Sequence, residues 1–300
     1  MHTRTVLKTY EGTPAVDGAG VRLLRVFGHA DTQDLDPFLL LDFFDSADPQ
    51  DYIKGFPWHP HRGIETITYL VEGLLEHGDS LGNRGLIEPL GCQWMTDGSG
   101  IIHQEMPQPS ARMLGAQLWL NLPRAHKMTE PAYRDITSKD LRIVEDDRVQ
   151  VKLIAGSYAD VKGPVSGTYV DLFYFDITIK PARRFELWLP AEERVFLLLL
   201  EGAVTIPTGD TLEAGRTRGV LLSQGEYIRI DSQNGARLLL MAGKPLNEPV
   251  AWGGPIVMNT REEIKTAFED LDRDAFIKHA PPAEKNSSPG GAAVNRFYTD

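Results

Sequence analysis

Short runs of strand-forming residues, separated by turn residues, recur along nearly the whole chain. The runs are rich in β-branched, aromatic and leucine residues, and each is bounded by Gly, Pro, Asp or Ser. Many short strands with frequent turns predict an all-β fold of sandwiches or barrels, not alternating strand–helix units. The runs are TVLKTYEG, VRLLRVFG, ETITYLVEG, VQVKLIAGSY, TYVDLFYFDITI, VFLLLLEGAVTI, EYIRID and ARLLLMAG.

Helix signals are few. The clearest begins at Thr260, which is followed three residues later by Glu263, the spacing of a capping box. Apolar residues then recur from Ile264 to Leu271 at the spacing of one helical face. We therefore expect a C-terminal helix near residues 260–279, and a second short helix near 138–141.

The length of 300 residues suits two domains of ordinary size. The stretches 66–77 and 195–206 resemble each other, since each has an apolar run, then Glu-Gly, then another run. Two copies of one β-fold explain this resemblance. We expect an N-terminal domain over residues 1–140, a C-terminal domain over 141–280, and a flexible tail over 281–300, which is rich in Pro, Gly, Ala and Ser.

Charge and cysteine content limit the partners and the compartment. The formal net charge is −11 and no dense Lys/Arg patch occurs, which argues against direct nucleic acid binding. Cys92 is the single cysteine, so no intrachain disulfide can form, as is usual in a reducing compartment. The N-terminus has no apolar segment typical of a signal peptide, and the longest apolar runs are too short to cross a bilayer. We expect a soluble cytoplasmic protein with no membrane contact.

Two pairs of polar residues have the spacing of metal ligands. His59 and His61 stand one residue apart in FPWHPHRG, and His103 and Glu105 do so in GIIHQEMP. On a strand, residues i and i+2 point to the same face, so each pair can present both side chains together. Strands of one sandwich can face each other across its interior. The sequence therefore predicts a site of three histidines and one carboxylate.

This set of donors suits a first-row divalent ion. Imidazole binds Fe, Ni, Cu and Zn well, and a carboxylate suits harder ions such as Fe(II) and Mn(II). Four protein ligands leave two positions free on an octahedral ion, as in non-haem iron sites that bind O₂. The other histidines are expected to be structural or solvated, and His77, just past the Glu-Gly turn, has as its alternative a place beside the metal ligands.

Glu65 is a rival to Glu105. It follows His61 by four residues, so on a continuing strand it would share a face with both histidines of the first pair. Spacing alone does not decide which carboxylate binds a metal, and either is a candidate catalytic base. Nearby aromatic residues are candidates for lining a substrate pocket, although ordinary core packing explains them as well: Phe56, Trp58 and Trp94.

The second half offers no equivalent donors. When the Glu-Gly turns and the later strands of the halves are aligned, the positions of the four candidate ligands are taken by Trp188, Pro190, Arg237 and Leu239. We expect only the first domain to bind metal.

These motifs resemble the pirin family of the cupin superfamily. The matching segments spread from about residue 20 to 270 and are GFPWHPHRGIETITYLVEG, QWMTDGSGIIHQEMP, AQLWLNLP, KMTEPAY and GPIVMNTREEI. The resemblance implies a bicupin, with two stacked β-sandwich cupin domains and a metal, usually iron, in the N-terminal one. It implies that the ligands are His59, His61, His103 and Glu105, and it leaves Glu65 as a residue near the metal.

The resemblance also implies a choice of functions. Some bacterial pirins are similar to quercetin 2,3-dioxygenases, so a flavonol-like aromatic and O₂ are the expected substrates, with Fe(II) as the expected metal and Mn, Ni, Cu or Zn as alternatives. Other pirins resemble non-enzymatic regulators that sense metal or redox state and bind transcription or metabolic partners. A sugar or small-molecule isomerase using Zn or Mn is a third reading. A monomer is expected.

Overall fold

The computed structural model describes residues 2–165, 169–207, 209 and 211–279. Contacts between Cα atoms divide the chain into two compact units. Unit 1 consists of Met1–Thr13, Val26–Pro37 and Lys139–Leu246. Unit 2 consists of Pro14–Arg25, Phe38–Ser138 and the chain from Asn247 onward.

The units are not two continuous halves. The chain passes from unit 2 to unit 1 after Ser138, beside the expected boundary at residue 140. However, the N-terminal strand belongs to unit 1, where β1 (Val6–Tyr10) pairs with β21 (Gly219–Leu222), and the C-terminal helix belongs to unit 2. The expected ranges 1–140 and 141–280 miss this exchange, because a strand pattern predicts an extended segment without predicting the sheet that it joins.

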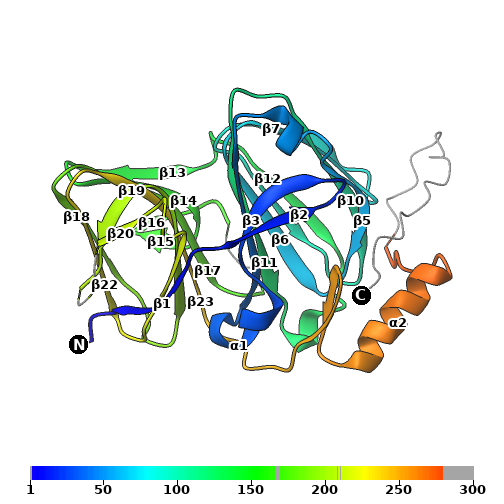
Figure 1. Cartoon of the computed structure of the whole chain (residues 1–300). Coiled ribbons are helices and arrows are strands. Elements are labelled where there is room, and N and C mark those ends of the chain that lie inside the picture. Colours follow the sequence, from blue (N-terminus) through cyan, green and yellow to red (C-terminus); the bar gives the residue numbers. More distant parts are fainter. Residues whose placement is uncertain (1, 166–168, 208, 210, 280–300) are drawn as a thin grey trace. The chain divides into compact units, whose positions relative to one another are not determined.

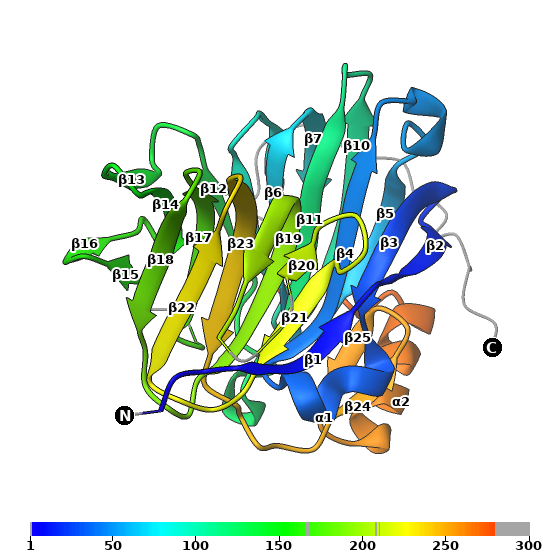
Figure 2. The ribbon, with the colours of Figure 1, turned by 60° about the vertical axis from the view of Figure 1, so that its left-hand side comes forward.

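Unit 1 is built from antiparallel strands in the order β1-β21-β19-β23-β17-β14-β13, with β18, β20 and β22 joined to them. Figure 2 shows β1, β21 and β19 side by side. A short hairpin pairs β15 with β16. The remaining strands of this unit are β13 (Arg142–Glu145), β14 (Val149–Ala155), β15 (Ser157–Tyr158), β16 (Val161–Lys162), β17 (Leu172–Ile179), β18 (Arg183–Trp188), β19 (Arg194–Thr205), β20 (Thr211–Glu213), β22 (Tyr227–Ser232) and β23 (Ala236–Gly243).

Strand β19 joins the two layers of unit 1. The sequence suggests two strands around Glu201-Gly202, but the structure has one strand whose pairing with β23 shifts between Leu199 and Glu201. Gly202 has a φ of +74°, which a glycine adopts readily. Such an irregularity bends a strand. Before it β19 pairs with β21 and β23, and after it β19 pairs with the end of β23 and then with β20 and β22. Leucine, isoleucine, valine and phenylalanine side chains fill the space between the layers.

The sandwich of unit 2 is built from two sheets (Figure 1). The larger has the order β12-β9-β6-β11-β4-β3-β2 and the smaller has the order β5-β10-β7-β8. Leu70 of the larger sheet packs with Leu75 and Ile87 of the smaller one, so these faces enclose a core. The strands are β2 (Thr13–Asp17), β3 (Val21–Phe27), β4 (Phe38–Ser46), β5 (Phe56–His61), β6 (Ile64–Glu72), β7 (Leu74–Asp79), β8 (Arg84–Ile87), β9 (Cys92–Thr96), β10 (Ile101–Gln108), β11 (Met113–Asn121) and β12 (Ala132–Ile136).

The all-β fold predicted from the sequence is confirmed, and helices are short. Residues 138–140 form a turn, not the expected helix, and the expected tail at 281–300 lies outside the described residues. In the described part of the chain, no helix is both long and apolar enough to cross a membrane. The helical segments before the C-terminal one are η1 (His29–Asp31), α1 (Thr32–Leu35), η2 (Pro49–Asp51) and η3 (Arg124–His126).

The C-terminal segment of unit 2 forms a hairpin of β24 (Ala251–Gly253) and β25 (Ile256–Met258), followed by helix α2 (Arg261–Asp272). The predicted capping box is confirmed: Thr260 Oγ1 accepts from Glu263 N at 3.2 Å, and Glu263 Oε2 accepts from Thr260 N at 2.9 Å. The helix ends before the expected residue 279, because Asp274 has a left-handed φ of +54°.

The capping box yields a first prediction. Thr260→Ala removes the acceptor for Glu263 N, so the free energy of unfolding should fall by about 1 kcal/mol. Urea denaturation of the metal-free protein measures this change. Thr266→Ala on the exposed surface of the same helix is the control, because its hydroxyl donates only to the Glu262 carbonyl. Equal losses in the two variants would contradict the proposed contribution of the cap.

Candidate metal centre

Strand β5 presents two histidines to the interior of unit 2. It lies at the edge of the smaller sheet. Proline has no backbone N–H to donate to a neighbouring strand, so Pro57 and Pro60 are tolerated in an edge strand such as this one. His59 lies between the two prolines and His61 follows them, and both histidines point to the same face, as strand alternation requires. His59 is half-buried and His61 is 1% exposed.

Strand β10 brings the third histidine beside this pair. His103 pairs directly with His59 across the two strands and is completely buried. Its ring centroid lies 4.2 Å from that of His59 and 5.1 Å from that of His61. One ligand nitrogen from each residue lies within 4.8 Å of the other two. We call His59, His61 and His103 the histidine cluster.

Hydrogen bonds fix the tautomers of two of these rings. His59 Nδ1 lies 3.0 Å from the Pro57 carbonyl, and His61 Nδ1 lies 3.0 Å from the Pro255 carbonyl. A carbonyl oxygen only accepts, so each Nδ1 carries the hydrogen and each Nε2 has a free lone pair. The two Nε2 atoms are 3.1 Å apart. Two lone pairs at this distance repel each other, and a cation bound between them relieves the repulsion.

The cluster is neutral near pH 7. Burial lowers the pKa of His59 to about 4. Burial, together with repulsion from the neighbouring histidines, lowers the pKa of His61 and of His103 well below the ordinary 6.5. Metals bind neutral imidazole, so all three rings are ready to act as ligands without losing a proton. Both ring nitrogens of His103 are buried without a hydrogen-bond partner.

Glu105 lies on the same face of β10 but stands apart from the cluster. Among the described residues, the group with ligand atoms within 4.8 Å of one another contains the histidines and not this glutamate. Glu105 Oε1 accepts a hydrogen bond from Thr68 Oγ1 at 3.0 Å, and Oε2 is buried with no partner. Burial raises the pKa of Glu105. One of its oxygens is thus held and the other is available.

Glu65 points away from the histidines, so the strand-continuation argument for it was wrong. The chain leaves β5 at Arg62 and turns at Gly63, which has a φ of +80°, before entering β6 of the other sheet. On β6 the inward side chains include Thr68, which bonds to Glu105, and alternation puts Glu65 on the opposite face. There Glu65 Oε1 accepts from Thr96 Oγ1 at 2.6 Å.

The predicted aromatic lining is only partly present. Phe56 lies near His59, with ring centroids 6.3 Å apart. Trp58 alternates with His59 and so lies on the outer face of the smaller sheet, and Trp94, opposite Ile67, lies on the face of β6 that carries Glu65. The sequence argument missed Trp119, whose ring centroid lies 4.9 Å from that of His61.

The C-terminal segment supports the end of β5. Arg62 is 2% exposed and donates from Nε to the Ser99 carbonyl, from Nη1 to Asp270 Oδ2 and from Nη2 to the Phe276 carbonyl, at 2.7, 2.8 and 2.9 Å. Its guanidinium lies 4.2 Å from the centroid of the Phe276 ring. These contacts, and the one from Pro255 to His61, join the site to residues that come some two hundred positions later in the chain.

Two acidic residues near the site, Asp97 and Asp79, were missed from the sequence. Asp97 is fully buried and neither carboxyl oxygen has a hydrogen-bond partner. Burial and repulsion from Glu65 and Glu105 raise its pKa well above the usual value. An Asp-Gly dipeptide is typical of a turn and gives no hint of burial. His77 and Asp79 form a third i, i+2 pair on β7, and this spacing could have found them.

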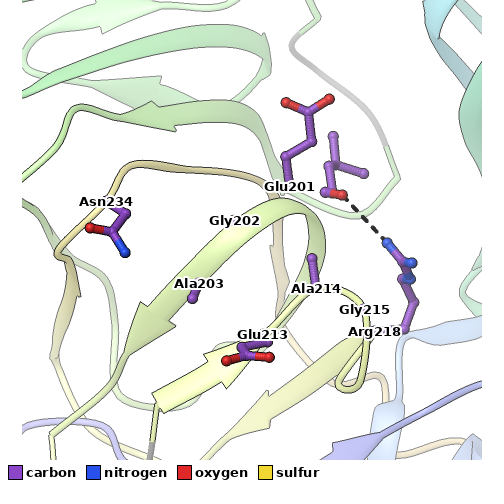
Figure 3. A pocket seen from close by; sticks show the side chains of 9 residues that line it. Glu201, Gly202, Ala203, Glu213, Ala214, Gly215, Arg218 and Asn234 are labelled. Carbon is purple, nitrogen blue, oxygen red and sulfur yellow. Dashed lines mark hydrogen bonds between the residues drawn. The ribbon is translucent and has the colours of Figure 1, made fainter.

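A cavity of about 530 Å³ lies elsewhere, in unit 1 (Figure 3). Arg218 at its rim already donates to the carbonyls of Leu199 and Leu200, at 2.8 and 3.5 Å. Glu201, Glu213 and Asn234 also line it. The described residues that line it include no histidine or cysteine, so it is not the expected metal site.

Comparison with known proteins matches both halves of the chain. Residues 20–120 match the Pirin family and residues 174–277 match the Pirin C-terminal cupin domain. This chain belongs to the pirin family. The resemblance inferred from the histidine motifs is thereby confirmed, together with the bicupin fold.

Relatives extend over nearly the full length of this pirin. A pirin-like protein of Caulobacter vibrioides is 44% identical over 279 residues, which cover 92% of this chain and 100% of the relative. Human pirin is 37% identical, covering 85% of this chain and 88% of its own. The crystal structure of a quercetin 2,3-dioxygenase from Acinetobacter baumannii is 33% identical with a TM-score of 0.84, covering 92% of this chain and 99% of that one.

The residues present fit the divalent metal that the family implies. The histidine cluster offers buried, neutral nitrogen donors, two with opposed lone pairs and one with no partner. Glu105, on the same strand as His103, adds a carboxylate oxygen that has no hydrogen-bond partner among the described residues. Three neutral imidazoles and one carboxylate suit a first-row divalent ion.

The lowered pKa of His59 predicts a dependence of stability on pH. Above pH 6.5 His59 is neutral in both the folded and the unfolded chain, but between pH 6.5 and about 4 only the unfolded chain takes up the proton. Stability should therefore fall as the pH falls through this window. Relative to His59→Phe, the metal-free protein should lose roughly 3 kcal/mol between pH 7 and pH 4.

Urea denaturation of chelator-treated protein at several pH values measures this difference. His29→Phe, at an exposed position, controls for the loss of a histidine as such. A difference between the original protein and His59→Phe that stays constant from pH 7 to pH 4 would contradict the prediction.

Proposed function

We propose that this pirin is a metal-dependent dioxygenase that acts on a flavonol-like aromatic such as quercetin, with O₂ as the second substrate. The convergence of three neutral histidines in the N-terminal cupin fold carries the proposal. The likeness to a structure described as a quercetin 2,3-dioxygenase supports the choice of substrate. Fe(II) is the proposed metal, because a His₃Glu set combines imidazole with a harder oxygen donor; Mn, Ni, Cu and Zn are the alternatives.

Each site residue has a proposed role. The histidine cluster binds the metal, with His59 and His61 using the Nε2 atoms that their Nδ1 hydrogen bonds leave free. Glu105 is the proposed carboxylate ligand and catalytic base, with Thr68 holding its other oxygen. A bound divalent ion supplies Lewis-acid chemistry that lowers the pKa of a coordinated hydroxyl group. Glu65 has no proposed role in the reaction, because it lies on the far face of β6.

The burial of the cluster indicates the direction from which substrate arrives. His61 and His103 are 1% and 0% exposed, whereas His59 is half-buried. The accessible side of the site is therefore that of His59, where Phe56 provides an aromatic surface. A planar aromatic substrate can stack there while its hydroxyl groups point toward the cluster.

The same burial favours one alternative, a non-enzymatic regulator that senses metal or redox state. A cluster with two of three ligands fully enclosed leaves little room for a large substrate. Fe(II) and Fe(III) in one shell differ by a full charge, which a protein partner can read at the surface. On this alternative the iron-loaded protein consumes no O₂ with any flavonol, and partner affinity changes with the oxidation state of the iron.

Incubation of Fe(II)-loaded protein with quercetin and O₂ tests the proposal. We expect the flavonol absorption to disappear, with consumption of O₂ and release of carbon monoxide. His103→Ala should reduce the rate to that of protein without metal, because a ligand is lost. Glu65→Gln should keep its activity if it folds, since Glu65 faces away from the cluster. Absence of turnover in the fully metal-loaded protein would overturn the dioxygenase proposal.

A further inference from the structure

Strand β7 brings another polar pair to the face that carries the cluster. β7 lies next to β10 in the smaller sheet, on the side away from β5 (Figure 1). In their register Glu105 pairs with His77, and His103 pairs with Asp79. His77 and Asp79 are 1% and 6% exposed. The row of inward polar side chains that begins on β5 therefore continues across β10 to β7.

His77 is held from two directions. Its Nε2 lies 3.4 Å from Asp79 Oδ2. Its ring stacks on Tyr133 of β12, with centroids 4.7 Å apart and planes only 2° from parallel. A ring fixed between a carboxylate and an aromatic face has little freedom to rotate, so His77 offers a rigid edge to its neighbours.

Asp79 is itself fixed. Its Oδ1 accepts from the backbone N–H groups of Leu81 and Asn83, both at 2.9 Å, and its Oδ2 accepts from Asn83 Nδ2 at 2.9 Å. The turn after β7 thus builds a cradle for this carboxylate. Asp79 is held by two backbone N–H groups and by the Asn83 side chain, and its Oδ2 atom lies 3.4 Å from His77 Nε2.

Glu105 lies directly opposite His77 on the neighbouring strand. Thr68 holds Oε1 from the opposite sheet, while Oε2 is buried with no partner. Residues directly opposite on antiparallel strands have Cβ atoms about 5 Å apart, so the side chains of Glu105 and His77 are neighbours. Both ring nitrogens of His77 are buried, and neither has a hydrogen-bond partner among the described residues. His77 reaches toward the cluster as well, since its ring centroid is 6.1 Å from that of His103.

We propose that His77, braced by Asp79 and Tyr133, is a positioning residue that orients the Glu105 carboxylate toward the metal bound by the histidine cluster. This inference rests on the proposed metal site. Groups that orient metal ligands from behind commonly change metal affinity by 10–100-fold when they are removed. The brace accounts for two buried polar side chains, His77 and Asp79, to which the reaction itself gives no role.

Binding of Co(II) to the full-length protein tests the brace without any turnover. Its dissociation constant is measured by competition with a chelator, and its visible absorption reports the coordination. His77→Phe keeps a flat ring against Tyr133 but loses the ring nitrogens, and should weaken Co(II) binding about 10–100-fold and change the spectrum. Asp79→Asn should act in the same direction. His77→Gln, which keeps a hydrogen-bonding group, should retain part of the lost affinity.

Glu76→Gln is the matched control, because Glu76 neighbours His77 on the same strand and is exposed on its other face. It should bind Co(II) as the original protein does. If His77→Phe destabilises the fold, Asp79→Asn and His77→Gln carry the test, scored by the increase in Tm that Co(II) produces in each. His77 and Asp79 variants with unchanged affinity and spectrum would overturn the brace and leave the proposed function standing. An original protein that binds no Co(II) would overturn both.

Discussion

Two hydrogen bonds from imidazole to backbone carbonyls determine what this site can do. Because Pro57 and Pro255 accept from the Nδ1 atoms of His59 and His61, both Nε2 lone pairs are directed into the same small space. Burial then disfavours protonation, which would otherwise relieve the repulsion between them. A buried, uncharged pair of lone pairs is an unfavourable arrangement in the absence of a cation. The metal-free protein thus holds two Nε2 lone pairs in mutual repulsion, and a divalent ion that binds between them removes this repulsion.

The cupin sandwich makes this arrangement possible through its alternation. The smaller sheet aligns one inward row of histidines and carboxylates across β5, β10 and β7. The larger sheet contributes side chains that contact this row. Thr68 bonds to Glu105, Trp119 contacts His61 and Tyr133 stacks on His77. Each inward pair of the smaller sheet therefore contacts a residue from the facing sheet. Leucine and isoleucine side chains between the same sheets exclude water on one side of the site.

Much of this was predictable, and the failures have clear physical causes. Period-two spacing predicted that His59 and His61 share a face, and that two such pairs can meet, because alternation is local geometry. Glu65 was misplaced because one glycine with a positive φ, Gly63, ends the strand and transfers the chain to the other sheet. Asp97 was invisible because an Asp-Gly turn signature carries no information on burial. The membership of β1 and α2 in the units depends on pairing over long sequence distances, which no local pattern records.

The carbonyl that sets the tautomer of His61 comes from Pro255, and the contacts of the adjacent Arg62 come from Asp270 and Phe276. During synthesis, the strand with the histidines emerges from the ribosome long before these partners are made. A nascent chain that stops short of the hairpin and helix has the donor residues but lacks the carbonyl that directs one of them. The complete geometry around His61 and Arg62 can therefore form only after residues 255–276 have been synthesised.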